Sequence, residues 1–248
     1  MNKTLKWILI GIAVIIGLLI LTAVGFGLKF KSETKKMHVI ETKEVVHNIF
    51  AIKNNFVNMF LVKDSDNYIA IDAGADEKVI KDELKKLSID TSKVVAVFLT
   101  HGDGDHTAAL KSFSNAKIYI SRDEEQMING KTAKMMFFHN SISRKDYTLV
   151  VDGQKLLIGK TLINCITTPG HTPGSMSYLI NDKYLFVGDA FGLKDGKVDK
   201  PNSFFSKDMP LAIKSFQKIN NLSAAEYIFT AHAGFTSDYK NAVKTELK

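Results

Sequence analysis

Four short segments, far apart in this chain, each carry residues that bind metal ions in proteins, and each follows a hydrophobic run. A hydrophobic run that ends at polar residues is typical of a buried strand that gives way to a loop. Together the segments supply four histidines and three aspartates, about the ligand number that two divalent ions need. These residues are His101, Asp103, Asp105, His106, His171, Asp189 and His232. The sequence therefore predicts a dinuclear metal centre where strands end.

The hydrophobic patterning of the rest of the chain predicts two halves, each with strands followed by a helix. In the first half we expect strands within residues 38–52 and at 58–62, 68–71, 94–99 and 117–120, with helices at 76–87, 107–113 and 122–129. In the second half we expect strands at 148–151, 154–158, 161–167, 177–180, 183–187 and 227–230, with helices at 209–219 and 237–247. Residues 130–146 lack clear periodicity and are interpreted as a loop or lid. This order indicates an α/β fold of four layers, with two sheets inside and helices outside.

Residues 7–28 form a run of 22 residues without a charge. At about 1.5 Å per residue, a helix of this length measures about 33 Å, enough to cross the hydrocarbon core of a bilayer. A cleaved signal peptide is the alternative, but its apolar stretch is shorter, about 7–15 residues, and the end of this run is a poor cleavage site. We therefore expect a membrane anchor over residues 1–36 and a globular domain over residues 37–248.

The lysines around the apolar run give two opposing indications of orientation. They are Lys3 and Lys6 before the run, and Lys29, Lys31, Lys35 and Lys36 after it. The excess on the second side weakly favours a cytoplasmic domain, whereas a short N-terminal tail favours the opposite orientation. We expect a single-pass membrane protein with its globular domain outside the cytoplasm.

The charge of the chain argues against a nucleic-acid partner. The net charge is +7, but the lysines are scattered and there are only two arginines. Such a distribution favours solubility and attraction to anionic lipid headgroups. The single cysteine, Cys165, lies in an apolar run and is interpreted as a buried core residue. We therefore expect a membrane lipid bilayer and a small-molecule substrate as partners, and no nucleic acid.

The first of the four segments, from His101 to His106, resembles the His-x-His-x-Asp-His signature of the metallo-β-lactamase superfamily. The other three segments occur in that family in the same order, and the resemblance covers about residues 46–236. It implies a four-layer αββα sandwich in residues 37–248, behind one N-terminal transmembrane helix. The stretch around His171, followed by Gly188 and Asp189, is similar to the glyoxalase II-like branch.

The resemblance also implies which residue holds which ion. His101, Asp103 and His171 would hold the first metal ion. Asp105, His106 and His232 would hold the second, and Asp189 would bridge the two. Asp72 resembles a buried family aspartate that supports the metal-binding loop.

Residue 103 departs from the family pattern, because most members have histidine there. With aspartate as a ligand, the charges of two divalent ions, three carboxylates and a bridging hydroxide add to zero. The same centre with a neutral histidine would carry +1, so the centre with aspartate is the weaker Lewis acid. A carboxylate also shifts preference from zinc toward harder ions such as iron or manganese. In having an acidic residue at this position, the chain is similar to the flavodiiron branch, which has glutamate there. Aspartate is shorter than glutamate, so Asp103 is interpreted either as a direct ligand or as a ligand acting through water.

The sequence thus leads to a metal-dependent hydrolase as the first hypothesis. A hydroxide that bridges two divalent ions, zinc in the first instance, would attack an ester, thioester, lactone or phosphoester. Asp105 would orient that hydroxide or transfer its proton. Asp103 motivates an alternative, a di-iron oxidoreductase of flavodiiron type. A membrane-tethered metal-binding module without catalysis is a third. The sequence assigns neither a particular substrate nor an oligomeric state.

Overall fold

The computed structural model describes residues 2–135, 138–142 and 144–247. These residues form two compact units, one ending at Met37 and one beginning at His38.

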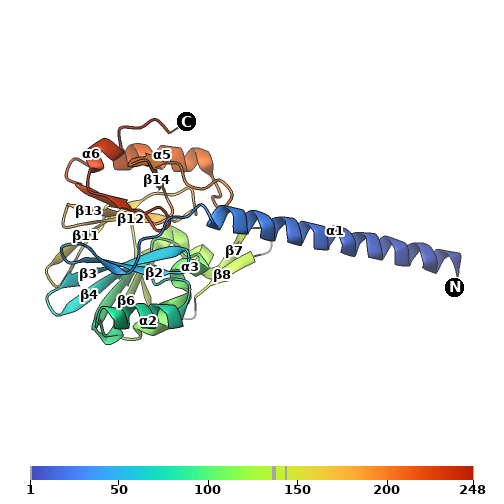
Figure 1. The fold of residues 1–248 in the computed structure, drawn as a ribbon, viewed down its shortest axis with the longest axis horizontal. Helices are drawn as coiled ribbons and strands as arrows, with labels where there is room; N and C mark the ends of the chain where they lie inside the picture. The colour runs from blue at the N-terminus through green and yellow to red at the C-terminus, as the bar shows by residue number, and fades with distance from the viewer. Residues whose placement is uncertain (1, 136–137, 143, 248) are drawn as a thin grey trace. The chain divides into compact units, whose positions relative to one another are not determined.

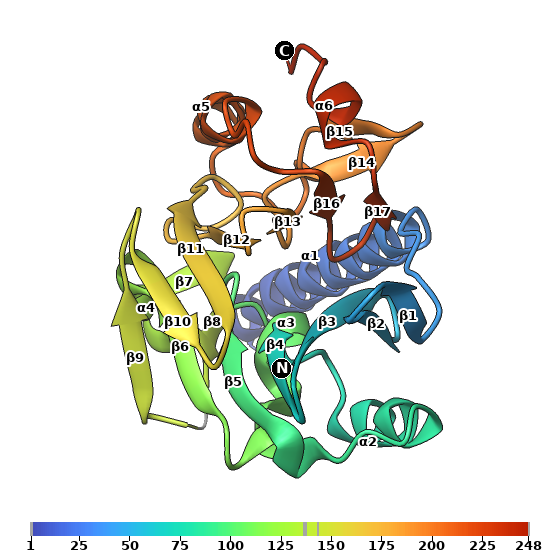
Figure 2. The same cartoon turned by 90° about the vertical axis from the view of Figure 1, so that its left-hand side faces the viewer.

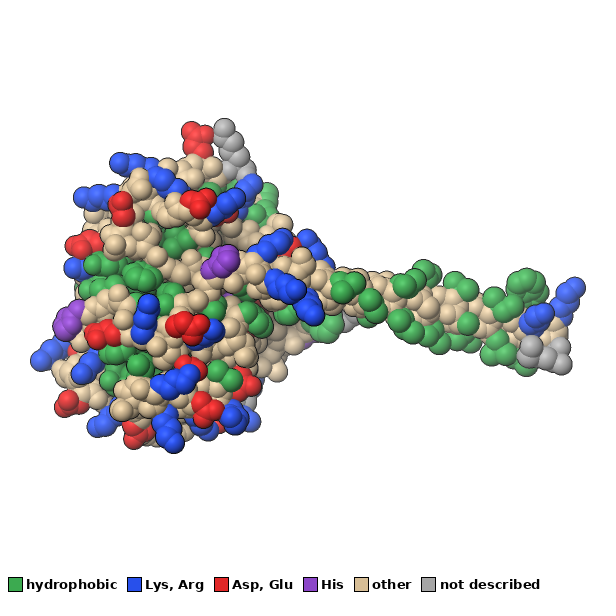
Figure 3. Space-filling model, viewed as in Figure 1, with side chains coloured by type: hydrophobic (Ala, Val, Ile, Leu, Met, Phe, Trp, Pro, Cys, Tyr) green, Lys and Arg blue, Asp and Glu red, His purple; other side chains and the backbone are tan. Residues whose placement is uncertain are grey.

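The first unit is dominated by a single helix, α1 (Lys3–Thr34), whose first turn is capped by the side chain of Asn2. Its mean hydropathy reaches 2.9 over an 18-residue window, none of which is buried. Figure 3 shows hydrophobic side chains along the helix and lysines toward both ends. The helix is long and apolar enough to cross a membrane, a property that signal sequences share.

The second unit contains a seven-stranded sheet with the order β1-β2-β3-β4-β5-β6-β9 (Figure 1). Its strands are β1 (Lys43–Val46), β2 (Ile49–Asn54), β3 (Val57–Asp64), β4 (Asn67–Ile71), β5 (Val94–Phe98), β6 (Lys117–Ser121) and β9 (Tyr147–Val150). The first four strands pair antiparallel, whereas β4, β5, β6 and β9 run parallel. Parallel neighbours need crossover connections, and α2 (Glu77–Lys86) lies in the connection from β4 to β5.

A six-stranded sheet follows, with the order β10-β11-β12-β13-β16-β17. Its strands are β10 (Lys155–Ile158), β11 (Thr161–Thr167), β12 (Met176–Ile180), β13 (Tyr184–Phe186), β16 (Tyr227–Phe229) and β17 (Phe235–Thr236). Only the pair β13–β16 is parallel within this sheet. The helices α5 (Met209–Asn220) and α6 (Tyr239–Ala242) and the small ribbon of β14 (Gly192–Lys194) and β15 (Lys197–Asp199) complete this half.

Short elements fill the connections of the first half. They are the 3-10 turns η1 (Thr91–Lys93), η2 (Ala108–Phe113) and η3 (Arg122–Glu124), and the short helices α3 (Gly104–Thr107) and α4 (Glu125–Ile128). The first motif falls within α3 and the loop before it. The predicted helix over residues 107–113 is therefore mostly a 3-10 turn, because the chain tightens directly after the motif.

Hydrophobic clusters join four layers, as the patterning predicts. Figure 2 shows α5 and α6 beyond the second sheet and α2 beyond the first. Between the sheets, Phe60 and Phe98 of the first meet Tyr178 and Phe186 of the second. Strand β5 is buried on both faces, since Val97 packs toward α2 and Phe98 packs between the sheets. Cys165 is fully buried in that inter-sheet cluster, which confirms its interpretation. The αββα architecture is thus an arrangement of two sheets between two helical layers.

Three expectations about elements are corrected. Residues 130–146 are not simply a loop, because β7 (Asn129–Met135) and β8 (Phe138–Ser141) form a hairpin there. Residues 136, 137 and 143 of that expected lid lie outside the described residues. The closing helix is shorter than predicted, with only α6 formed within residues 237–247. Strand β9 belongs to the first sheet, beside β6, although it follows the hairpin and was grouped with the second half.

Candidate metal centre

The four segments that carry the predicted ligands meet at one edge of the sandwich. His101 follows β5, His171 follows β11, Asp189 follows β13 and His232 follows β16. Backbone hydrogen bonds tie these loops together: Met176 donates to the carbonyl of Thr100, and Ala231 donates to that of Gly188. Ligands of open α/β sheets bind beyond the carboxyl ends of strands, where such loops converge. The fold therefore brings all seven predicted residues into one site.

A first group consists of His101, Asp103 and His171, whose possible ligand atoms all lie within 4.8 Å of one another. Oδ2 of Asp103 is 3.1 Å from Nε2 of His171 and 3.4 Å from Nε2 of His101. Both imidazoles are buried, with 1% and 3% of the His101 and His171 side chains exposed. This group contains the ligands that the resemblance assigns to a first ion.

A second group consists of Asp105, His106 and His232, again with ligand atoms within 4.8 Å. Oδ2 of Asp105 lies 3.3 Å from Nε2 of His232 and 3.6 Å from Nε2 of His106. The side chain of Asp105 is 22% exposed, whereas that of His106 is fully buried. Asp105 is therefore the member of this group that meets solvent most directly.

Asp189 lies between the two groups. Its Oδ1 is 3.4 Å from Nε2 of His106 and 3.2 Å from Nε2 of His232. Its Oδ2 is 3.6 Å from Nε2 of His171. The two oxygens of one carboxylate thus face opposite groups, which is the placement that a bridging ligand needs.

The buried polar atoms of this site fit a metal ion. Nε2 of His101, Nε2 of His106 and Oδ1 of Asp189 are buried and have no hydrogen-bond partner among the residues that the structure describes. Buried polar atoms without partners are costly and rare in folded proteins. The ligand atoms of these three residues lie within 4.8 Å of one another and are of types that coordinate divalent ions, so metal ions bound in this space would satisfy them.

Neighbouring groups turn the histidines toward that space. Oδ2 of Asp72 lies 2.8 Å from Nδ1 of His106, and the carbonyl of Phe56 accepts from Nδ1 of His232 at 2.6 Å. Holding Nδ1 in this way leaves Nε2 as the metal-binding nitrogen. Asp72 also accepts from the backbone nitrogen of Thr100 at 2.7 Å, which supports the loop after β5. The expected supporting role of Asp72 thus has a direct structural basis.

The charges of the site favour a cation at the second group. Burial lowers the pKa of His106, but Asp72, Asp189 and Asp105 outweigh it and raise that pKa well above its usual value. Burial also lowers the pKa of His232, but the carboxylates of Asp189 and Asp105 outweigh this effect and raise the pKa to about 10. At the first group, burial and then the ammonium of Lys134 lower the pKa of His171 to about 4. The two groups are therefore electrostatically unequal.

Lys134 was not singled out from the sequence, yet its ammonium lies within the first group. Nζ is 2.7 Å from Oδ2 of Asp103 and 3.0 Å from Nε2 of His171. The side chain is only 9% exposed and comes from β7. Asn140 of β8 donates to the other oxygen of Asp103 at 2.8 Å. No local signal marks this lysine, because it is one of many in the chain and its segment lacks periodicity.

Glu124 is a second residue that sequence reasoning missed. Its buried carboxylate accepts hydrogen bonds from the backbone nitrogens of Gly102 and Gly174, at 2.8 and 2.9 Å, and from Oγ1 of Thr172 at 2.7 Å. Burial raises its pKa. Glu124 thus joins the loop of the first motif to the loop that carries His171.

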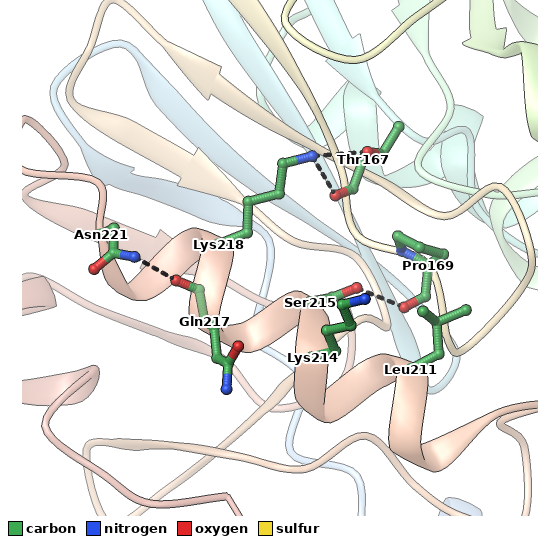
Figure 4. Close-up of a pocket in the computed structure, with 8 residues that line it drawn as sticks. All are labelled: Thr167, Pro169, Leu211, Lys214, Ser215, Gln217, Lys218 and Asn221. Atoms are coloured by element: carbon green, nitrogen blue, oxygen red, sulfur yellow. Dashed lines mark hydrogen bonds between the residues drawn. The ribbon is translucent and has the colours of Figure 1, made fainter.

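Helix α5 contacts the residues just before His171 and supports the loop that carries it (Figure 4). Oγ of Ser215 donates to the carbonyl of Pro169 at 2.7 Å, and Lys218 donates to the side chain of Thr167 at 2.8 Å. These residues line an open groove of about 420 Å³ along α5. None of the seven predicted ligands lines this groove, and the hydrogen bonds from α5 hold the loop that carries His171.

Comparison with known proteins agrees with this geometry. Residues 52–232 match the family model described as the metallo-beta-lactamase superfamily. A probable polyketide biosynthesis zinc-dependent hydrolase, BaeB of Bacillus velezensis, is 30% identical over 63% of this chain and 61% of its own length. The hydroxyacylglutathione hydrolase of Buchnera aphidicola is 30% identical over 65% of this chain and 57% of its own. The matches thus span about three fifths of these relatives.

Solved structures show the same fold at lower identity. A B3 metallo-beta-lactamase with an active-site glutamic acid superposes with a TM-score of 0.64. The two chains are 17% identical, and the match covers 86% of this chain and 88% of the other. At this identity the likeness concerns the fold alone, which is the αββα sandwich predicted from the motif.

Proposed function

The chain belongs to the metallo-beta-lactamase superfamily, and from this premise we propose that it is a metal-dependent hydrolase. The observation that carries the proposal is the placement of Asp189, whose Oδ1 faces His106 and His232 while its Oδ2 faces His171. The chemistry of the donors supports zinc, since imidazole and carboxylate groups are its usual ligands beside thiolate. The name of the Bacillus velezensis relative, a zinc-dependent hydrolase, supports the same ion.

In the fully loaded centre, we propose, the residues hold two ions. His101, Asp103 and His171 would hold the first, Asp105, His106 and His232 would hold the second, and Asp189 would serve both. The chemistry that such ions would supply is a hydroxide near neutral pH and polarisation of the carbonyl or phosphoryl oxygen under attack. The side chain of Asp72 keeps the imidazole of His106 oriented during turnover, and the carbonyl of Phe56 does the same for His232.

Asp105 has a second task in this proposal. Its carboxylate is partly exposed and lies beside both histidines of the second group. From this position it orients the attacking water and accepts its proton at a carboxylate oxygen. The proton then passes to the leaving group, so that the carboxylate is restored at the end of the cycle.

The substrate class that we propose is an ester, thioester, lactone or phosphoester. The relative named hydroxyacylglutathione hydrolase supports the thioester member of this set, because an acylglutathione is a thioester. Each member offers an oxygen that an ion polarises and a leaving group that departs after attack.

The test begins with the full-length protein in detergent. We expect it to hydrolyse at least one of four probes: an aryl ester, a thioester, a lactone and an aryl phosphodiester. Chelation should reduce turnover to the uncatalysed rate, and added zinc should restore it, because the nucleophile depends on the ion. Elemental analysis of the same samples distinguishes zinc from iron or manganese. Undiminished turnover in protein shown to be metal-free would contradict the proposal.

We also propose that α1 anchors the protein as a single membrane span, with the domain from His38 onward outside the cytoplasm. The uncharged run of 22 residues supports a span, and the short N-terminal tail supports this orientation. We expect the protein in the membrane fraction at full length, with the domain cleaved by protease added to spheroplasts. A shortened soluble product would instead identify α1 as a signal sequence, and protection from protease would reverse the orientation.

A further inference from the structure

Lys134 places a positive charge where the ligands of the first ion converge. We infer that the ammonium of Lys134 and the first metal ion compete for the same ligands, so that the two ion positions load unequally. The inference rests on the proposed metal centre and adds to it a residue of this chain that controls how the centre fills.

The competition follows first from the lone pairs of the ligands. An ammonium group carries only donors, so a hydrogen bond across the 3.0 Å between Lys134 and Nε2 of His171 requires this nitrogen to accept, whereas the other tautomer would donate from Nε2 to Oδ2 of Asp103 at 3.1 Å. A neutral imidazole offers one acceptor nitrogen with one lone pair, and a metal ion needs that same lone pair. Nδ1 of His171 then carries the proton, and it lies 3.3 Å from Oγ of Ser206. His171 therefore serves either the ammonium or the ion, but not both.

The second position has no such conflict at its central histidine. Within the described part of the chain, Nε2 of His106 is buried without a hydrogen-bond partner, and its Nδ1 is already held by Asp72. The carboxylates of Asp105 and Asp189 face this nitrogen at 3.6 and 3.4 Å. An ion that enters here displaces a proton from the imidazole of His106, but no lysine ammonium. The second position should therefore fill first.

The same contact accounts for the unusual residue at position 103. A lysine ammonium that is 9% exposed needs an anionic partner, because an unpaired buried charge is costly. Asp103 supplies that partner at 2.7 Å, whereas a neutral histidine would not. Asn140 holds the other oxygen of Asp103 in place. Asp103 and Lys134 thus form a pair, and each explains the presence of the other.

The charge balance allows both loading states. The three carboxylates of the centre are those of Asp103, Asp105 and Asp189. One divalent ion together with the ammonium neutralises them. Two divalent ions together with one hydroxide also neutralise them, so in that state the ammonium must move out to solvent, because its charge would otherwise stay buried without a partner. The first ion can therefore enter when its concentration is high enough to displace the ammonium from Asp103 and His171.

The test counts ions and needs no substrate. Full-length protein in detergent is stripped with chelator, titrated with zinc, desalted and analysed for zinc per chain. We expect the unsubstituted protein to retain about one ion, with a second bound only at higher zinc concentration. Lys134→Met should retain about two, with the weaker binding constant tightened about tenfold or more, a change in the range seen when partners of metal ligands are altered. Lys131→Met, which removes an exposed lysine from the same strand, is the matched control and should behave like the unsubstituted protein.

The outcomes separate the inference from the proposed function. Two ions bound with equal affinity by the unsubstituted protein would overturn the inference, as would identical titrations of Lys134→Met and Lys131→Met. Lys134→Gln, of similar length and without charge, replaces the methionine variant if circular dichroism shows that the latter is unfolded. Failure of every sample to bind any ion would instead refute the proposed metal centre itself.

Discussion

Asp105→Asn should lower kcat/KM for the responsive substrate by at least about 100-fold, the lower end of the range for loss of a catalytic acid or base. Asparagine keeps the size of the side chain but cannot accept a proton, and its amide oxygen is a weaker ligand than a carboxylate. The domain should still fold, because this side chain is 22% exposed at the rim of the second group. The measurement is steady-state hydrolysis alongside zinc per chain.

The control for this variant is Asp66→Asn, which makes the same chemical change in the exposed turn between β3 and β4. It should hydrolyse substrate at the unsubstituted rate. If Asp105→Asn also kept full activity at unchanged zinc content, Asp105 would have no part in proton transfer. If activity fell only in proportion to lost zinc, its role would be that of a ligand alone.

Gly174→Ala should destabilise the domain by about 2–6 kcal/mol. A Cβ atom built on Gly174 would lie 2.0 Å from the backbone nitrogen of Glu124, closer than such atoms approach in folded proteins. Overpacking of this kind costs about 1–3 kcal/mol. Moving the loop away also breaks the hydrogen bond from Gly174 to the buried Glu124 carboxylate, which adds about 1–3 kcal/mol. Thermal unfolding followed by circular dichroism measures the change.

Gly104→Ala is the matched substitution, because a Cβ atom there meets no atom within 4 Å. Its effect on stability should stay within about 0.5 kcal/mol. For a domain of this size, each kcal/mol of lost stability lowers the melting temperature by about 2–4 °C. The melting temperatures of the two variants should therefore differ clearly. Equal melting temperatures would mean that the His171 loop moves freely away from Glu124.

The pairing of Asp103 with Lys134 also bears on the choice of metal. An aspartate at this position, taken alone, favours iron or manganese over zinc. In the folded chain the carboxylate faces an ammonium at 2.7 Å, so its presence has an explanation that requires no harder ion. The argument for a di-iron oxidoreductase is weaker for that reason, and the hydrolase proposal needs only the donors already described.

The amino-acid sequence by itself determined the family, the four-layer architecture and the buried aspartate Asp72 beneath the metal loop. The family and the role of Asp72 were identified from the resemblance of the motifs. The layers could be predicted because a strand buried on both faces is a continuous apolar run, and a residue directly after it has a fixed place at the end of that strand. The seven predicted ligands lie together for the same reason, and their roles as ligands stay predictions until ions are counted.

Only the tertiary structure decided which sheet β9 joins, that residues 129–141 form a hairpin, and that Lys134 and Glu124 reach the site. Periodicity reports which face of a segment is buried, but not which distant segment covers it. Lys134 meets His171 across 37 positions of sequence, and Glu124 meets Gly174 across 50. Such contacts depend on the path of the whole chain, because a charged side chain is buried only where folding brings its partner to it.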